Sequence, residues 1–312
     1  MKTRIWLALI AVYIAWGSTY LAIRFAVETI PPFLMAGFRF LVAGAILYTW
    51  RRVAGDPTPT RIQWRSASIV GLLLLLGGNG GVVWAEQRVA SGIAALIVGS
   101  APLFMVLIDA LRPGGQRPNW QTGSGVLVGF LGIALLIGPS QWTGNGLQLD
   151  NIGVLVLLLA SILWATGSLY SRNAQLPSSP LLGTGMEMLA GSAGLFILGT
   201  LTGEWGRLEL AAIAPRSLWG LLYLITFGAL VGFAAYTWLL RVAPTPLVAT
   251  YAYVNPVIAI FLGNLLAKEA LTPRLLIAAL VIVSAVALIN TGRAKTTSPA
   301  PRTVVVPAPG ED

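Results

Sequence analysis

The chain has 312 residues, of which 56% are hydrophobic and only 10% charged, with a formal net charge of +9. Ordinary soluble domains carry about 25% charged residues, so this composition excludes a large soluble domain and indicates a polytopic membrane protein. The basic residues lie in loops beside apolar stretches rather than on one basic face, which excludes nucleic acid as a partner. The absence of cysteine and histidine excludes disulfides, histidine metal sites and Ser–His–Asp catalysis.

Hydropathy divides residues 5–291 into ten apolar stretches of about 18 to 24 residues, and about 20 apolar residues are enough to cross the hydrocarbon core as a helix. Proline and glycine clusters such as Pro31-Pro32 mark the turns between them. We therefore expect ten transmembrane helices, over 5–27, 33–50, 67–85, 91–110, 121–138, 152–170, 181–201, 217–239, 246–266 and 273–291.

The basic residues of the loops predict the orientation, because positive loops stay on the cytoplasmic side. With the N-terminus inside, the inner segments hold thirteen lysines and arginines and the outer segments hold six. The sequence therefore predicts that both termini are cytoplasmic. We expect the segment 293–312, which is rich in Thr, Ser and Pro, to be a disordered cytoplasmic tail.

A weak internal repeat relates the two halves of the chain. Trp16-Gly17-Ser18-Thr19-Tyr20 in the first span resembles Trp164 to Tyr170 in the sixth, and Pro102 in the fourth span matches Pro256 in the ninth. Because five spans are an odd number, the second copy enters the bilayer from the opposite side, as in many secondary transporters. We therefore expect two inverted five-helix repeats, over 1–140 and 141–292.

Two charges occupy matching positions in this repeat, Arg39 in the second span and Glu187 in the seventh, at an offset of 148 residues. A charge inside a span is unfavourable unless it faces protein or water. A functional interpretation makes each a gating or coupling charge of its half. The alternative is a structural charge that is bonded to carbonyls or reaches the interface.

Aromatic and polar side chains at helical spacing predict a substrate cavity between spans one, three, four, six, eight and nine. Asn79 lies among four glycines, which allow close packing or a local hinge. We expect aromatic walls, a few hydroxyls and amides, and no strong charge at the centre. The candidate substrate-binding residues are Trp16, Ser18, Tyr20, Asn79, Trp164, Ser168, Tyr236, Tyr251, Tyr253 and Asn255.

The chain resembles the EamA-domain permeases of the drug/metabolite transporter superfamily, and among them the exporters of the YedA/YddG type. The resemblance covers the chain to about residue 292. It implies two inverted EamA units in the inner membrane and export of amino acids, related metabolites or amphipathic drugs. One departure is that Glu269 has Gly115 as its first-half counterpart. The residues that carry the resemblance are Trp16 to Arg24, Pro31-Pro32 with Arg39-Phe40, Gly78-Asn79-Gly80, Ser91 to Ala95, Ala252 to Val257 and Lys268 to Leu271.

We therefore predict a non-enzymatic secondary transporter, monomeric in function, that exports neutral and aromatic amino acids by alternating access and uses no cofactor or metal. Without a P-loop, its energy would come from the substrate gradient or from protons, with uniport equally open. Export of amphipathic drugs is the main alternative. A nucleotide-sugar carrier, a lipid-modifying enzyme and a channel fit less well, because the basic cluster, paired carboxylates or repeated filter that each needs is missing.

Overall fold

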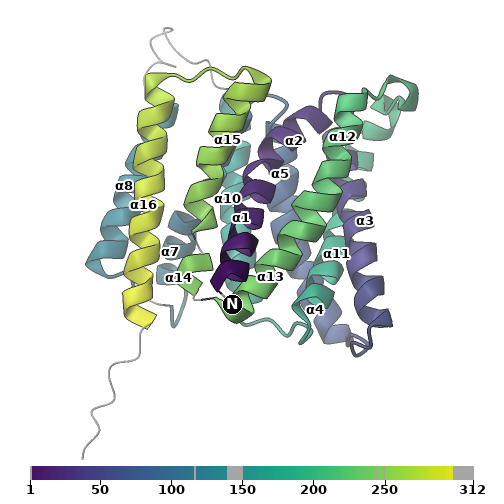
Figure 1. Cartoon of the computed structure of the whole chain (residues 1–312), viewed down its shortest axis with the longest axis horizontal. Helices are drawn as coiled ribbons and strands as arrows, with labels where there is room; N and C mark the ends of the chain where they lie inside the picture. The colour runs from purple at the N-terminus through teal and green to yellow at the C-terminus, as the bar shows by residue number, and fades with distance from the viewer. Residues whose placement is uncertain (1, 116, 139–149, 244, 249, 298–312) are drawn as a thin grey trace, which may run out of the picture.

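We describe the protein from a computed structural model that defines residues 2–115, 117–138, 150–243, 245–248 and 250–297. Within these ranges the chain is helical and contains no strand (Figure 1). The elements are α1 (Lys2–Gly17), α2 (Thr19–Ala26), α3 (Pro32–Val53), α4 (Arg61–Gly71), η1 (Leu72–Asn79), α5 (Gly80–Ala85), α6 (Ser91–Gly99), α7 (Ala101–Leu111), α8 (Trp120–Ile137), α10 (Asn151–Ser171), α11 (Pro180–Leu201), η2 (Glu204–Arg207), η3 (Leu210–Ala212), α12 (Pro215–Tyr223), η4 (Leu224–Val231), α13 (Gly232–Val242), α14 (Thr245–Val248), α15 (Tyr251–Ala267) and α16 (Pro273–Thr297).

The membrane spans agree with the sequence prediction. Nine helical segments of the described chain are long and apolar enough to cross a membrane, and the ninth expected span is the shorter apolar helix α15, of 17 residues. The prediction of an all-helical polytopic membrane protein is therefore confirmed. Helix α16 continues to Thr297, past the expected start of the tail at residue 293. The rest of that tail (298–312) and the predicted repeat boundary at 140/141 lie outside the described residues.

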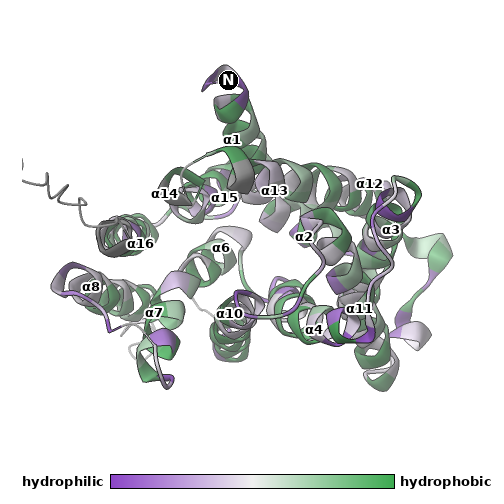
Figure 2. Cartoon of the chain, turned by 90° about the horizontal axis from the view of Figure 1, so that it is seen from below, coloured by the Kyte–Doolittle hydropathy of each residue, from purple (hydrophilic) through white to green (hydrophobic). Residues whose placement is uncertain are grey.

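The two ends of the bundle differ in the chain segments that they contain. Helix α1 begins and α16 ends at the lower end in Figure 1, which we call the terminal end. The turns 86–90 and 268–272 lie at the upper end, which we call the turn end. Figure 2 looks along the helices and shows hydrophobic residues along all of them. Large exposed side chains on the outside, such as Leu127 and Leu280, are the surface that lipid would cover.

Two spans contain a wider π-type helix at matching places in the repeat. These segments are η1 and η4, each of eight residues, in the third and eighth spans. Spans one and four are also interrupted, at Ser18 and Ser100. Short π segments often mark functional positions because they displace side chains and free backbone groups. Here η1 and η4 both contribute residues to a central cavity.

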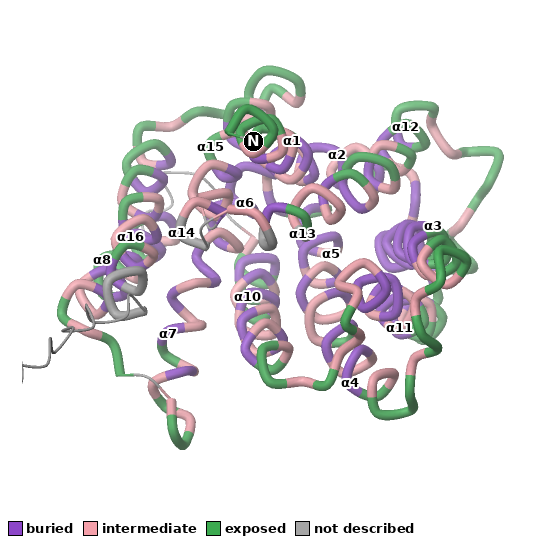
Figure 3. Tube along the Cα trace, turned by 60° about the horizontal axis from the view of Figure 1, so that its bottom comes forward, coloured by how far each residue is buried: buried purple, intermediate pink, exposed green. Residues whose placement is uncertain are grey.

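Glycines allow the helices of the two halves to approach backbone to backbone. Helices α3 and α11, which hold many buried positions (Figure 3), meet where a Cβ on Gly44 would lie 3.0 Å from the carbonyl oxygen of Gly185. At Gly71, at the end of α4, a Cβ would lie only 2.2 Å from the carbonyl oxygen of Glu187. Helices in lipid associate through such small-residue contacts rather than through a hydrophobic driving force.

Gly71→Ala is expected to destabilise the protein by about 1–3 kcal/mol, because the added methyl group meets a backbone that has no rotamer by which to move away. The melting temperature in detergent should fall by several degrees. The matched control is Gly123→Ala in helix α8, where an added Cβ has no neighbour within 4 Å. Equal melting temperatures for the two variants would contradict the packing described here.

Candidate functional site

A cavity of about 160 Å³ lies between the helices of the two halves. All six spans that the sequence predicted contribute to it, and helix α3 contributes as well. The lining residues are Trp16, Thr19, Tyr20, Ile23, Arg39, Gly78, Asn79, Val82, Val98, Gly99, Ala101, Pro102, Met105, Ala160, Trp164, Gly228, Phe233, Tyr251, Ala252, Asn255 and Pro256.

Trp16 is the centre of an aromatic cluster on one wall of the cavity. Its ring centroid lies 5.3 Å from that of Phe233, 5.0 Å from Tyr236 and 5.1 Å from Tyr251. Its indole Nε1 donates a hydrogen bond to the carbonyl oxygen of Gly228, at 3.1 Å. The residue therefore connects helix α1 of the first half to η4, α13 and α15 of the second.

The two asparagines of the cavity come from opposite halves. Asn79 is the last residue of η1, and a Cβ on its neighbour Gly78 would lie 2.9 Å from Cε3 of Trp164, so glycine makes room for that indole. Asn255 precedes Pro256 within helix α15. Its side-chain oxygen Oδ1 is buried and has no hydrogen-bond partner among the residues that the structure describes. The cavity therefore contains at least one acceptor that the protein leaves unused.

Arg39 corrects the expectation of a cavity without a strong charge. Its side chain lines the cavity from helix α3 and is only 4% exposed. The guanidinium carbon lies 4.8 Å from the ring centroid of Phe40, while Nε and Nη1 have no hydrogen-bond partner within the described part of the chain. Hydropathy places this charge inside the second span, whereas only the fold shows that helix α3 borders the same cavity as Trp16.

The structure brings together Trp16, Tyr20, Asn79, Trp164, Tyr251 and Asn255 of the ten predicted binding residues. Ser18 does not line the cavity, because its hydroxyl is bonded to the carbonyl oxygen of Ile14 and to the hydroxyl of Tyr223. Tyr236 lies behind the wall, in ring contact with Trp16 and Tyr251. Neither Ser168 nor Tyr253 is a lining residue.

Glu187, the second predicted gating or coupling charge, is not part of the cavity lining. It lies in α11 at the close contact with Gly71. The sequence analysis in turn missed apolar lining residues such as Val98 and Met105, whose side chains resemble those that face lipid. Pro102 and Pro256, which were not proposed as binding residues, did carry a sequence signal, because they match in the repeat.

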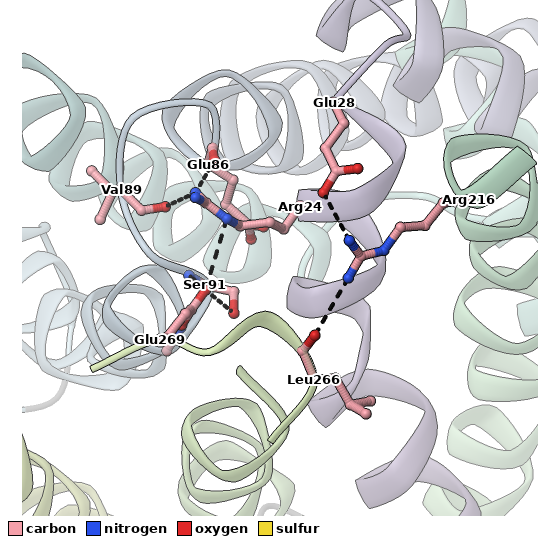
Figure 4. A network of polar contacts seen from close by, with 9 residues as sticks. Arg24, Glu28, Glu86, Val89, Ser91, Arg216, Leu266 and Glu269 are labelled. Atoms are coloured by element: carbon pink, nitrogen blue, oxygen red, sulfur yellow. Dashed lines mark hydrogen bonds and ion pairs between the residues drawn. The ribbon is translucent and has the colours of Figure 1, made fainter. Parts of the chain in front are cut away.

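A polar network joins the two halves at the turn end (Figure 4). Glu269, from the second half, accepts hydrogen bonds from the backbone N–H and the hydroxyl of Ser91, both at 2.8 Å, and from the N–H of Gly92 at 3.1 Å. These donors form the N-terminus of helix α6, in the first half. A carboxylate at a helix N-terminus is favourable because it satisfies free N–H groups and the helix dipole.

Arg24 extends this network from helix α2. Its Nη1 donates to the carbonyl oxygens of Glu86, at 3.0 Å, and Val89, at 3.3 Å. Its Nε lies 3.9 Å from the carboxylate of Glu269. We call Arg24, Glu86, Val89, Ser91 and Glu269 the closing network, since it fastens both halves together at one end of the cavity.

The opposite end is hollow. A second cavity, of about 570 Å³, lies at the terminal end between helices α4, α7 and α10, and its lining includes Arg65, Arg112 and Asn173. The closing network therefore joins the two halves at the turn end, an arrangement that we call fastened, and the second cavity lies at the terminal end.

Glu86 holds a buried carboxyl group within the closing network, just beyond the third span. Both carboxyl oxygens are buried, and no described residue forms a hydrogen bond with either of them. Burial raises the pKa of this carboxyl well above its usual range, and the nearby charge of Glu269 adds to the increase, whereas Arg24 opposes it. The fastened arrangement therefore favours the protonated form of Glu86.

We expect the turn end to open as pH rises. A group whose pKa is raised in the fastened arrangement favours that arrangement below its ordinary pKa and ceases to do so as pH rises through the raised pKa. Labelling of a single cysteine at Val82, in the cavity, by an impermeant maleimide from the turn side should therefore accelerate with pH by more than ionisation of the thiol itself explains. Glu86→Gln should remove this additional dependence. A corrected rate that is flat or falls with pH in the parent protein would contradict the assignment.

Membrane-length helices around a central cavity, with one end fastened and the other hollow, define this protein as a membrane transporter. The model of the EamA-like transporter family matches residues 3–138 and 151–291, and the chain belongs to this family. The two matched segments are the two EamA repeats, one in each half of the chain.

Relatives support this assignment over nearly the whole length. The chain is 40% identical over 290 residues to the inner membrane transporter YedA of Escherichia coli, covering 92% of this chain and 90% of YedA. It is 26% identical to the transporter YvbV of Bacillus subtilis, covering 93% and 92% of the two chains. A solved crystal structure at 21% identity has a TM-score of 0.62 and covers 91% of this chain and 96% of that one, which supports the fold.

Proposed function

We propose that the protein is an inner-membrane secondary transporter that exports neutral and aromatic amino acids and related small metabolites. The observation that carries this proposal is the aromatic wall around Trp16, with the asparagines of both halves in the same cavity. An aromatic wall suits a flat or apolar side chain, and a few convergent polar groups orient the rest of a small molecule.

Transport would proceed by alternating access. In this proposal the two EamA repeats are inverted, both termini are cytoplasmic, and the turn end faces the outside. The closing network then seals the outer side while the cavity communicates with the cytoplasm. Release of substrate requires the network to part and the terminal end to close, with the interrupted spans and π segments as the places where the helices bend.

The energy would come from the substrate gradient or from a coupled proton. Glu187 and Arg39 are the proposed coupling or gating charges of the two halves, and Glu86 joins them as a buried carboxyl group in the closing network. In the alternative, uniport, the substrate gradient alone drives transport, and none of these groups has to bind or release a proton. A comparison of Glu187→Gln with the parent protein under a pH gradient distinguishes the two, since only a proton carrier would lose its dependence on the gradient.

Export of amphipathic drugs is the second candidate. It is favoured by the many apolar residues among the cavity lining, such as Ile23, Val82 and Met105. Such a cavity accepts apolar molecules through burial of surface rather than through specific hydrogen bonds.

The decisive experiment is uptake of labelled threonine, methionine, phenylalanine and tryptophan into liposomes that contain the purified protein, with and without a pH gradient. Saturable uptake of any of these, above that of empty liposomes, supports the proposal. Absence of uptake for all four, together with uptake of a lipophilic cationic dye, would favour drug export instead.

A further inference from the structure

Arg39 is a hydrogen-bond donor that the protein does not use. It is the one charged side chain among the described residues that line the cavity. Its Nε and Nη1 are buried without a hydrogen-bond partner, and no ion pair forms between this arginine and another described residue. The ring contact with Phe40 leaves Nε and Nη1 without an acceptor. A buried charge without a hydrogen-bond or ion-pair partner is unfavourable, so its persistence in a cavity wall points to an anionic partner that arrives with the substrate.

Asn255 supplies the complementary feature in the same cavity. Its side chain is 8% exposed, and its Oδ1 is a buried acceptor that lacks a donor. A cavity that holds both an unused donor and an unused acceptor matches a molecule with an anionic group and an N–H group. The fit is with a zwitterion rather than with an anion or a cation alone.

The local packing makes room for the guanidinium of Arg39. A Cβ on Gly228, in the π segment η4, would lie 3.1 Å from Nη2 of Arg39 and 2.9 Å from Cγ2 of Thr19. The same glycine accepts the indole hydrogen bond of Trp16. The guanidinium therefore lies beside the aromatic wall. One substrate could place its charged group against the guanidinium and its apolar ring against the wall.

We propose that Arg39 binds the carboxylate of an α-amino acid, that Asn255 Oδ1 accepts a hydrogen bond from its ammonium group, and that the ring cluster around Trp16 holds the side chain. The guanidinium fork matches a carboxylate, with which it can form two parallel charge-assisted hydrogen bonds. This inference rests on the proposed function and makes it narrower. Amines without a carboxylate are rejected, because they leave the arginine unpaired and bring a second positive charge into the cavity.

A rival role for Arg39 is to neutralise Glu86 when that carboxyl group is ionised, since the two groups influence one another electrostatically. The structure contains no ion pair between the two. The double variant Arg39→Gln/Glu86→Gln separates the roles. If neutralisation is the only role, removal of both charges restores transport. If Arg39 binds the substrate, the double variant stays as defective as Arg39→Gln.

The test measures competition against labelled phenylalanine uptake in proteoliposomes by three molecules with the same ring. Phenylalanine has both charged groups, phenethylamine lacks the carboxylate, and 3-phenylpropionate lacks the ammonium group. The parent protein should bind phenylalanine about 10- to 100-fold more tightly than phenethylamine, the effect expected for a charge-assisted hydrogen bond. It should also prefer phenylalanine to 3-phenylpropionate, by a smaller factor.

The variants assign these preferences to residues. Arg39→Gln should lower the affinity for phenylalanine by a similar factor, so that phenylalanine and phenethylamine bind equally well. Arg39→Lys should retain part of the preference for phenylalanine. Asn255→Leu should reduce only the discrimination against 3-phenylpropionate. Arg207→Gln is the matched control, because this arginine is 60% exposed and lies outside the cavity.

The outcomes separate the inference from the function on which it rests. Saturable phenylalanine uptake that phenethylamine inhibits equally well in the parent protein would overturn the zwitterion site and leave amino-acid transport standing. Restoration of transport in the double variant would overturn it too. Absence of uptake for every amino acid tested would overturn both proposals.

Discussion

Trp16→Ala is expected to reduce phenylalanine uptake at least about tenfold in proteoliposomes. The substitution removes three ring contacts, with Phe233, Tyr236 and Tyr251, and each such pair contributes about 0.5–1.5 kcal/mol beyond area burial. It also removes the hydrogen bond to Gly228. The lost contacts belong both to the cavity wall and to the junction of the two halves, so affinity and turnover should both fall.

Two companion variants separate these effects. Trp16→Phe keeps an apolar ring but loses the Nε1–H donor, so it should retain most of the affinity and lose part of the turnover. Trp120→Ala is the control for a tryptophan outside the cavity, since its side chain is 89% exposed. Unchanged uptake by Trp16→Ala, with loss of uptake by Trp120→Ala, would place the transport path elsewhere.

Glu269→Gln is expected to unfasten the turn end. The glutamine amide retains one acceptor oxygen and places an NH₂ group against N–H donors of Ser91 or Gly92. A lost charge-assisted hydrogen bond with an unsatisfied donor is unfavourable by about 1–3 kcal/mol. A single cysteine at Val82 should therefore react with an impermeant maleimide from the turn side about 5- to 150-fold faster.

The matched control is Glu28→Gln at the same end. Glu28 forms an ion pair with Arg216 at 3.6 Å, and both side chains are exposed, at 42% and 50%. An exposed pair contributes little, so this variant should label at nearly the parent rate. Equal labelling in Glu269→Gln and Glu28→Gln would show that the closing network does not hold the two halves together.

The spans could be predicted from the sequence because hydropathy and loop composition are local properties. The order of ten apolar segments and the charged position of Arg39 needed no tertiary information. The repeat also identified the pairs Trp16 with Trp164 and Pro102 with Pro256, all of which line the cavity. Aromatic and proline residues stand out in an apolar chain, so they carry a signal that can be read directly.

Which side chains line the cavity, and which turns meet, depends on how each helix is rotated about its axis and which helices pack together. Ser18 belongs to the same motif as Trp16, yet its hydroxyl bonds back to its own helix and to Tyr223. Glu86 and Glu269 are far apart in sequence, and only the fold brings their turns together. Helical rotation also decides that Arg39 lines the cavity while Glu187, its partner in the repeat, does not. Periodicity cannot supply these facts in a helix that is apolar on every face.

The central claim is that the turn end must part for substrate to cross. A reversible disulfide between cysteines at Gly92 and Ile260, from opposite halves, tests it most directly. A Cβ on Gly92 would lie 3.2 Å from the Cα of Ile260, so the two positions are in contact in the fastened arrangement, and the chain has no cysteine of its own. The account predicts that oxidation stops phenylalanine uptake and that dithiothreitol restores it. Undiminished uptake with the disulfide fully formed would contradict it.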